Sequence, residues 1–364
     1  MKRVIFAVIL VFVLGGCAKE DLGEYYPNIT NRELHYISRS GEKVEFDDDD
    51  FDAPIISNIY ENGKGVITFA SPLRKIYFLG SLDITSITIP TSVSEFEGNP
   101  FYKCENLARF VSKYSTSDGY ALVKNDAFVA LARNYRGENY EIAYGIKSIG
   151  ERALYGAKIT SVTIPNSVAT IADEAFAECD NLQELILPER IESLGRGVCS
   201  KCTSLSHVSL PKNVVLQEEF AGFVGCVNLE RFSGAFASMD GRCLIVDKSI
   251  YAFAPKDVAD YTITEDVTAI APRAFAQCDR LKSISIPEGV RELGGGVFYN
   301  CTHLEKITLA PTTPPTITRG EGSADLFGNL PDDYIIYVPM SSVTKYKGNS
   351  DWARYDSHIE GKNL

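Results

Sequence analysis

The chain has 364 residues, of which 45% are hydrophobic and 23% are charged, and its formal net charge is -12. These proportions are typical of a folded protein and exclude an intrinsically disordered chain, which would be poorer in apolar residues. The excess of acidic residues also argues against nucleic acid as a partner, because phosphates attract basic surfaces.

The first residues predict an export signal. Lys2 and Arg3 precede an apolar run from Val4 to Val13, and small residues and Cys17 follow this run. This order is typical of a secretory signal peptide, and the run is too short to span a bilayer. Residues 1–16 are therefore predicted to be a signal peptide that is removed on export.

The end of this signal, LGGC at residues 14–17, resembles the bacterial lipobox. The resemblance implies a lipoprotein in which Cys17 carries acyl chains, so that the lipid anchor is its only contact with a membrane. The next four residues, AKED, are similar to the export signal of Bacteroidota-type surface lipoproteins, which implies an outer-membrane protein exposed at the cell surface. An unlipidated signal cleaved before a cysteine, and an acidic tether facing the periplasm, remain as alternatives.

Residues 17–62 are predicted to hold the lipidated cysteine, a tether and an N-terminal cap. The run from Asp47 to Asp50 is the most acidic part of this segment. A calcium loop needs alternating carboxylates and a glycine at a fixed position, and the run has neither. We therefore interpret it as a solvated turn and predict no metal site.

The chain repeats with a period of 23 residues. Pro165, Pro188 and Pro211 stand 23 residues apart, and around Pro188 the unit reads LxxLxLPxxIxxL. A glycine-rich turn and a cysteine follow, with phenylalanine three residues before the cysteine and leucine three residues after it in most copies. Such a period indicates stacked coils, each of which needs its neighbours to bury an apolar face.

The recurring cysteines are interpreted as a structural ladder. Its members are Cys104, Cys179, Cys202, Cys226, Cys278 and Cys301. Cys199 and Cys202 together have the spacing of a redox or zinc motif, but Cys199 fills the slot that phenylalanine occupies in other copies. Neither a second pair nor a histidine cluster accompanies them, so we predict buried thiols and no cofactor. A disulfide between neighbouring ladder cysteines remains open.

The LxxLxL unit is the leucine-rich-repeat signature, with one short strand per coil. Apolar pairs from Ile67/Phe69 to Ile336/Val338 predict a parallel β ribbon of about ten short strands, in a solenoid over residues 63–339. Further pairs such as Ile191/Leu194 predict a second apolar wall, and each Ala-Phe-x-x-Cys segment predicts a short helical turn. The glycines that follow this wall are expected to have positive φ; they are Gly150, Gly195 and Gly294.

Two interruptions and a distinct end complete the predicted fold. Residues 117–132 and 239–254 align with each other, and each predicts a β-hairpin, inserted near 115–140 and 237–261. In residues 340–364, aromatic side chains that include Trp352 recur at near-helical spacing, which predicts a C-terminal capping helix.

With the 23-residue unit, the cysteine turn and the hairpins described, the chain resembles BspA-like leucine-rich-repeat surface proteins over about residues 55–360. The resemblance implies a non-catalytic protein that binds host matrix proteins or other cells. It supplies no catalytic residues. The chain departs from the repeat at Cys199, in the coil of residues 154–159 and near Phe220.

Candidate binding residues come from two surfaces. The strand position four residues before each proline, or its equivalent, holds a mixed polar rank: Arg109, Glu184, His207, Arg231 and Lys306. The strand position two residues before the proline is expected to point outward and mostly carries hydroxyls. The hairpins hold aromatic residues that are candidate hot spots, among them Tyr120, Phe128, Tyr251 and Phe253.

Two binding functions follow from these features. The first is adhesion through a host or bacterial surface protein, and the second is an accessory lipoprotein that binds a polysaccharide at the outer membrane. An enzyme is disfavoured, because the acidic residues are scattered rather than paired.

Overall fold

A computed structural model describes residues 29–80, 83–217, 219–318 and 325–364. The predicted signal peptide, Cys17 and the tether lie outside these residues, so lipid anchoring stays a prediction. Within the described ranges, no helix combines the length and the apolar character needed to cross a membrane.

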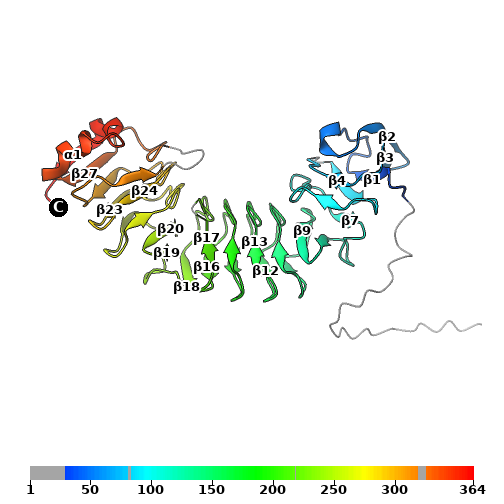
Figure 1. The fold of residues 1–364 in the computed structure, drawn as a ribbon, viewed down its shortest axis with the longest axis horizontal. Coiled ribbons are helices and arrows are strands. Elements are labelled where there is room, and N and C mark those ends of the chain that lie inside the picture. Colours follow the sequence, from blue (N-terminus) through cyan, green and yellow to red (C-terminus); the bar gives the residue numbers. More distant parts are fainter. Residues whose placement is uncertain (1–28, 81–82, 218, 319–324) are drawn as a thin grey trace, which may run out of the picture.

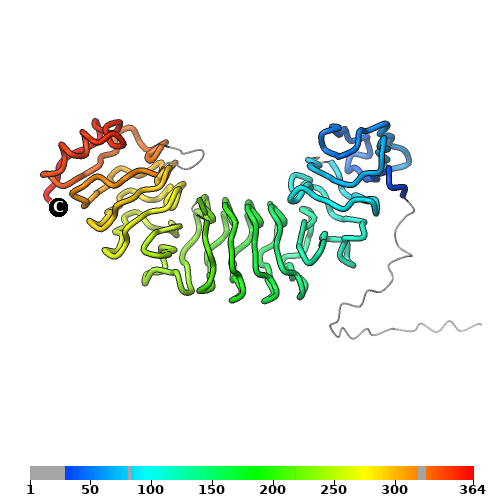
Figure 2. Tube along the Cα trace, viewed as in Figure 1, coloured from blue at the N-terminus to red at the C-terminus, as the bar shows by residue number. Residues whose placement is uncertain are grey.

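The described residues form an arched solenoid of stacked coils with a cap at each end (Figures 1 and 2). Most coils contribute one strand to each of two ribbons, and pairing within both ribbons is parallel, apart from the hairpins and the N-terminal cap. The structure thus confirms the predicted leucine-rich-repeat solenoid.

The first ribbon is the one predicted from the LxxLxL unit. In β14, Leu185 is buried while Glu184 and Ile186 are exposed, which is the alternation expected of a strand with one face on the core. The ribbon comprises β5 (Ile84–Thr88), β7 (Arg109–Val111), β10 (Asn139–Glu141), β12 (Ser161–Thr163), β14 (Glu184–Ile186), β16 (His207–Leu210), β18 (Arg231–Gly234), β21 (Asp260–Thr262), β23 (Ser283–Ile286), β25 (Lys306–Leu309), β27 (Ile335–Pro339) and β28 (Ile359–Lys362).

The predicted second apolar wall is itself a ribbon of strands, most of them two or three residues long. Segments this short cannot show an alternating pattern, so the sequence indicated only an apolar wall. Its strands are β4 (Lys75–Ile76), β6 (Glu95–Phe96), β9 (Ala127–Leu131), β11 (Ser148–Ile149), β13 (Thr170–Ile171), β15 (Ser193–Leu194), β17 (Val215–Leu216), β20 (Ser249–Phe253), β22 (Ala269–Ile270), β24 (Glu292–Gly294) and β26 (Thr316–Thr318).

A tight double turn brings the chain back to the first ribbon. The Cys179 N–H donates to the Phe176 carbonyl at 3.3 Å, and the Leu182 N–H donates to the Cys179 carbonyl at 3.1 Å. Glu178, between the phenylalanine and the cysteine, has a φ of 57°. Because a residue in the left-handed region cannot continue a right-handed helix, the turn does not extend into a helix.

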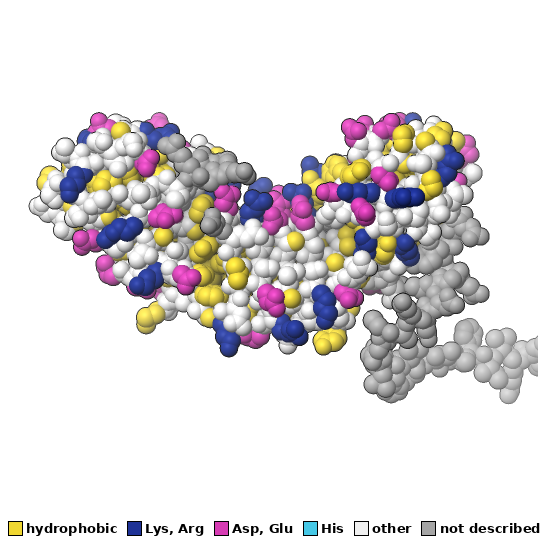
Figure 3. Space-filling view, viewed as in Figure 1, with side chains coloured by type: hydrophobic (Ala, Val, Ile, Leu, Met, Phe, Trp, Pro, Cys, Tyr) yellow, Lys and Arg dark blue, Asp and Glu magenta, His cyan; other side chains and the backbone are white. Residues whose placement is uncertain are grey.

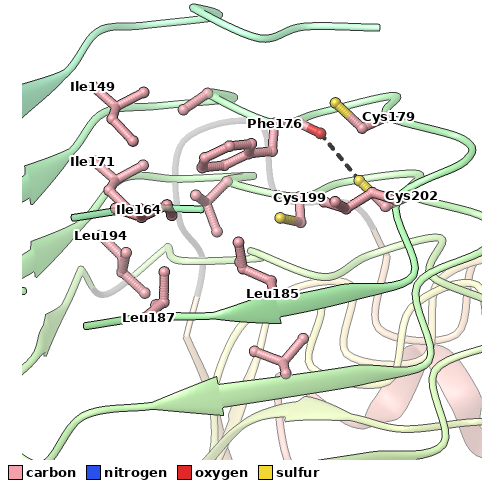
Figure 4. Packing of buried hydrophobic residues seen from close by; sticks show 14 of the residues in the cluster. Ile149, Ile164, Ile171, Phe176, Cys179, Leu185, Leu187, Leu194, Cys199 and Cys202 are labelled. Carbon is pink, nitrogen blue, oxygen red and sulfur yellow. Dashed lines mark hydrogen bonds between the residues drawn. The ribbon is translucent and has the colours of Figure 1, made fainter. Parts of the chain in front are cut away.

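The cysteine ladder is buried, and its thiols bond from coil to coil. Cys202 Sγ donates to the Phe176 carbonyl of the preceding coil at 3.0 Å, as Figure 4 shows. Cys226 Sγ donates in the same way to the Cys199 carbonyl at 3.1 Å. All eight cysteines in the described ranges are buried and none forms a disulfide, and burial raises the pKa of Cys199 well above its usual value. Cys199 therefore lies in the core in place of a phenylalanine.

Both predicted hairpins are present, but they lie within the solenoid. β8 (Ala121–Lys124) pairs with β9, and β19 (Cys243–Val246) pairs with β20, both antiparallel. The second strand of each hairpin then joins the second ribbon, since β9 pairs with β11 and β20 pairs with β22 in parallel. The hairpins are thus parts of the wall rather than protrusions.

The two faces of each hairpin pack against different parts of the core. Leu122 and Ala130 contact the N-terminal cluster, whereas Phe128 contacts the central cluster. In the second hairpin, Leu244 belongs to the central cluster and Phe253 to the C-terminal one. Successive residues of a strand point to opposite faces, and a β-bulge in each hairpin shifts this alternation, so that Phe128 and Ala130 face different clusters. The hairpins therefore divide the core into three units.

The N-terminal cap is an antiparallel arrangement of β1 (Glu33–Ser38), β2 (Ile55–Glu61) and β3 (Lys64–Phe69), with η1 (Asp48–Asp50) between β1 and β2. The prediction that Ile67 and Phe69 belong to the parallel ribbon is wrong, since both lie in β3. Alternating apolar residues fit antiparallel and parallel strands alike. The Asn62–Gly63 turn between β2 and β3 was the available sequence signal for a hairpin.

The C-terminal cap contains the predicted helix, α1 (Val343–Lys347), between η2 (Met340–Ser342) and η3 (Ala353–His358), and then β28, which the sequence did not indicate. Trp352 is fully buried, and its Nε1 donates to the Pro315 carbonyl at 2.7 Å. Tyr346 donates to the Pro311 carbonyl at 2.9 Å. These two aromatic residues close the apolar end of the last coils.

The glycines after the second ribbon are required by space rather than by φ. Neither Gly150, Gly195 nor Gly294 has a positive φ, so that expectation is wrong. A Cβ at Gly195 would lie 2.3 Å from the Asp173 nitrogen of the neighbouring coil, and one at Gly294 would lie 2.1 Å from the Pro272 nitrogen. Close approach of two backbones therefore selects glycine there.

We predict that Gly195→Ala lowers the free energy of unfolding by about 2–3 kcal/mol, because the neighbouring backbone must move to admit the methyl group. Gly150→Ala is the matched control, since its Cβ would lie 3.1 Å from the nearest atom, the Phe128 carbonyl oxygen. Urea unfolding followed by circular dichroism measures both variants. Equal midpoints for the two variants would contradict the spatial explanation.

Candidate functional site

The structure brings together three of the five predicted ribbon residues. Glu184 on β14 is in register with His207 on β16, and His207 is in register with Arg231 on β18. Arg109 on β7 and Lys306 on β25 are exposed in the same rank, but they lie in other sheets of the first ribbon.

His207 is the half-buried centre of this group. Its Nε2 lies 2.8 Å from Ser233 Oγ. Burial lowers the pKa of His207, the Arg231 charge lowers it further, and the Glu184 charge acts in the opposite direction. The imidazole is therefore neutral at pH 7 and offers one donor and one acceptor nitrogen.

An exposed isoleucine adjoins these polar residues. Ile186 is 50% exposed and is in register with Ser209, which in turn is in register with Ser233. We define the central ribbon patch by five residues on three adjacent strands: Glu184, Ile186, His207, Arg231 and Ser233. The patch combines a negative and a positive side chain, an apolar side chain and a hydroxyl on one face of the three strands.

The hydroxyl rank that the sequence placed on the strand face is half-buried or exposed along the first ribbon. Its members are Thr88, Thr163, Ser209, Ser233, Ser285 and Thr308. Small side chains in this rank leave the neighbouring charged rank accessible.

Two of the predicted hairpin contacts are wrong. Phe128 is 1% exposed and Phe253 is 3% exposed, because the second hairpin strands join the second ribbon and turn these rings into the core. Tyr120 is 37% exposed, and its ring meets the Tyr135 ring edge-on at 5.1 Å. Tyr251 is half-buried against the central cluster. Of these four aromatic residues, Tyr120 is the most accessible to a partner.

Sequence reasoning missed an aromatic row across neighbouring coils. The Tyr102 ring lies 5.5 Å from the Phe78 ring and 5.2 Å from the Tyr155 ring. The Arg152 guanidinium lies over Tyr102 at 4.8 Å, and the Arg133 guanidinium lies over Tyr155 at 5.6 Å. The irregular coil at residues 154–159 was the sequence signal that could have pointed to this row. Its ring faces are already covered by the protein's own cations.

Ion pairs connect successive coils on the surface. Arg196 Nε lies 3.3 Å from an Asp173 carboxylate oxygen, and Lys201 Nζ lies 3.2 Å from Glu178. Charged side chains of both signs line the hollow of the arch in Figure 3. Such exposed pairs are screened by solvent and contribute little stability each. Across the described ranges, no group of three His, Cys, Asp or Glu side chains could hold a metal ion.

A family model decides the relationship of the chain to known proteins. The model for the BspA type leucine rich repeat region matches residues 67–128, 125–236 and 248–320, in six copies. The chain belongs to the BspA-type leucine-rich-repeat family. A comparison with curated proteins gives no match.

Solved bacterial structures resemble this BspA-type chain. A leucine-rich repeat protein from Bacteroides ovatus shares 26% identity over 78% of this chain and 69% of its own, with a TM-score of 0.45. One from Eubacterium ventriosum shares 20% identity over 68% of this chain and 59% of its own, with a TM-score of 0.40. A leucine rich cell surface protein from Faecalibacterium prausnitzii shares 19% identity over 84% of this chain and 85% of its own, with a TM-score of 0.39.

We predict that Arg231→Gln raises the pKa of His207, because the substitution removes a positive charge that disfavours the imidazolium. In the parent protein, the folded-state pKa of His207 lies below its ordinary value of 6.5. The unfolded chain therefore binds more protons, and the stability that neutral His207 confers is lost as the pH falls below 6.5.

An NMR titration of the histidine side chains measures the shift, and Lys306→Gln is the control for removal of a charge elsewhere in the rank. A His207 pKa that does not change in Arg231→Gln would contradict the electrostatic coupling.

Proposed function

We propose that this BspA-type protein is a non-catalytic lipoprotein of the cell surface that binds other proteins through its first ribbon, in adhesion to a host or to other cells. The observation that carries the proposal is the central ribbon patch, in which three adjacent strands hold charged, apolar and hydroxyl side chains in register. Leucine-rich-repeat solenoids generally serve as interaction scaffolds, and their extended surfaces suit macromolecules.

The composition of the patch suits a protein partner. Ile186 offers an apolar contact that a partner can cover, and Arg231 is of a residue type that is enriched among interface hot spots. Glu184 and His207 lie beside them and can pair with polar groups at the rim. The surrounding small hydroxyls allow a second protein to approach the backbone closely.

The proposed location rests on the N-terminal sequence. The LGGC motif supplies the lipid attachment at Cys17, and the AKED stretch supplies the surface-export signal. Eleven residues, 18–28, separate the proposed anchor at Cys17 from the described fold.

A glycan-binding accessory function is the second candidate. Tyr144 is 83% exposed and Tyr120 is 37% exposed, and aromatic rings that face solvent are suitable for stacking on sugar rings. Calorimetry against host and dietary polysaccharides distinguishes this candidate, since a saturable heat abolished by Tyr144→Ala would favour it over protein binding.

The ribbon proposal is tested with residues 18–364 immobilised on a biosensor and presented with a panel of host matrix and bacterial surface proteins. We expect at least one saturable partner. Arg231→Glu should weaken its binding at least about tenfold, because a charge in a hot spot is reversed, whereas Lys306→Glu should change it less than about twofold. Equal effects of the two charge reversals, or no saturable partner in the panel, would contradict the proposal.

A further inference from the structure

A second surface lies on the N-terminal cap, away from the central ribbon patch. The cap sheet has the order β2-β3-β1-β5-β7, so β2 is its terminal strand. Asn62 and Gly63 form the turn to β3 with φ values of 53° and 77°. A two-residue hairpin closes on a hydrogen-bonded pair, and bonding then alternates along the strands. The backbone N–H and C=O groups of Asn58 and Tyr60 therefore face away from β3.

Exposed isoleucines accompany this open edge. Ile56 and Ile59 on β2 are 61% and 53% exposed, and Ile37 on β1 is 46% exposed. Ile59 is in register with half-buried Val66 on β3, which extends the apolar surface inward from the edge. Figure 3 shows hydrophobic side chains gathered on the N-terminal arm. Natural edge strands are usually protected by lysine or proline, and no lysine lies within β2.

Acidic residues lie at both ends of the same strand. Asp48 in η1 accepts a hydrogen bond from the Ile55 N–H at 2.8 Å, which places the run from Asp47 to Asp50 at the start of β2. Asp52 follows this run, whereas Glu61 at the other end of the strand is in register with Lys64 on β3. The field at the start of β2 is therefore negative, and it attracts a positively charged partner.

We propose that β2 binds an extended, basic polypeptide segment that adds to the cap sheet as a further strand. Main-chain hydrogen bonds to Asn58 and Tyr60 hold the segment, its apolar side chains cover Ile59, and its lysine or arginine side chains lie beside the aspartate run at the start of β2. This site is independent of the proposed function of the first ribbon.

A second copy of this chain fits the edge less well. Antiparallel pairing of two β2 strands across a two-fold axis places the aspartate run of one copy beside Glu61 and Lys64 of the other. The aspartates then face a glutamate and a lysine with no net positive charge, whereas a basic segment supplies lysine or arginine side chains beside them.

The experiment uses residues 18–364 and a labelled peptide of alternating lysine and valine, with fluorescence anisotropy at physiological salt. We expect saturable binding. A peptide of the same sequence, N-methylated at alternate residues, keeps the charge but lacks strand donors and should bind at least about tenfold more weakly. Ile59→Lys should weaken binding of the unmodified peptide by a similar factor. Val215→Lys is the matched control, since Val215 on β17 is 66% exposed and lies outside both proposed surfaces, and it should leave binding unchanged.

Three results would overturn the proposal: no binding of the unmodified peptide, equal binding of both peptides, or equal effects of the two substitutions. A concentration-dependent dimer that Ile59→Lys abolishes would assign the edge to a second copy instead. Because Arg231→Glu should leave peptide binding unchanged, failure at β2 and failure at the ribbon are distinguishable.

Discussion

Burial of each coil's apolar side by the next coil is the constraint on which the rest of the structure depends. A single coil has two or three short strands and turns and cannot enclose its own leucines. Stacking encloses them, and the Cys202 thiol bonds to the Phe176 carbonyl across the boundary between coils. In the C-terminal coils, the Phe253 and Phe275 rings stack at 4.7 Å. A thiol fits the position of Cys202 because it is small and apolar, and it still donates a hydrogen bond to a buried carbonyl.

The stacking of the coils also determines how side chains are arranged on the outer surface. Since every coil is held in register with its neighbour, side chains at one repeat position form ranks along the ribbon. Glu184, His207 and Arg231 meet only because β14, β16 and β18 are adjacent and parallel. The same three strands cover the central core unit, which lies between the two hairpins. A partner that binds there contacts the part of the solenoid with the most regular coils.

The 23-residue period was sufficient to predict the solenoid and the buried cysteines, because these features depend on side chains that repeat, and the alignment of residues 117–132 with 239–254 predicted the two hairpins. It could not identify β3 as antiparallel, since Ile67 and Phe69 alternate as a ribbon strand would. Nor could it place Phe128, because which face of a hairpin strand meets the core depends on the strand's pairing with β11. The role of Gly195 depends on a contact with another coil that no local pattern records.

The reactivity of the cysteines tests the stacked interior most directly. In residues 18–364, which lack Cys17, eight cysteines remain, all of them buried and none in a disulfide. A thiol-specific chromogenic reagent should find no reactive thiol in the native protein and all eight after unfolding in guanidinium chloride. Several reactive thiols in the native protein, or fewer than eight after unfolding, would contradict a core built on stacked, reduced cysteines.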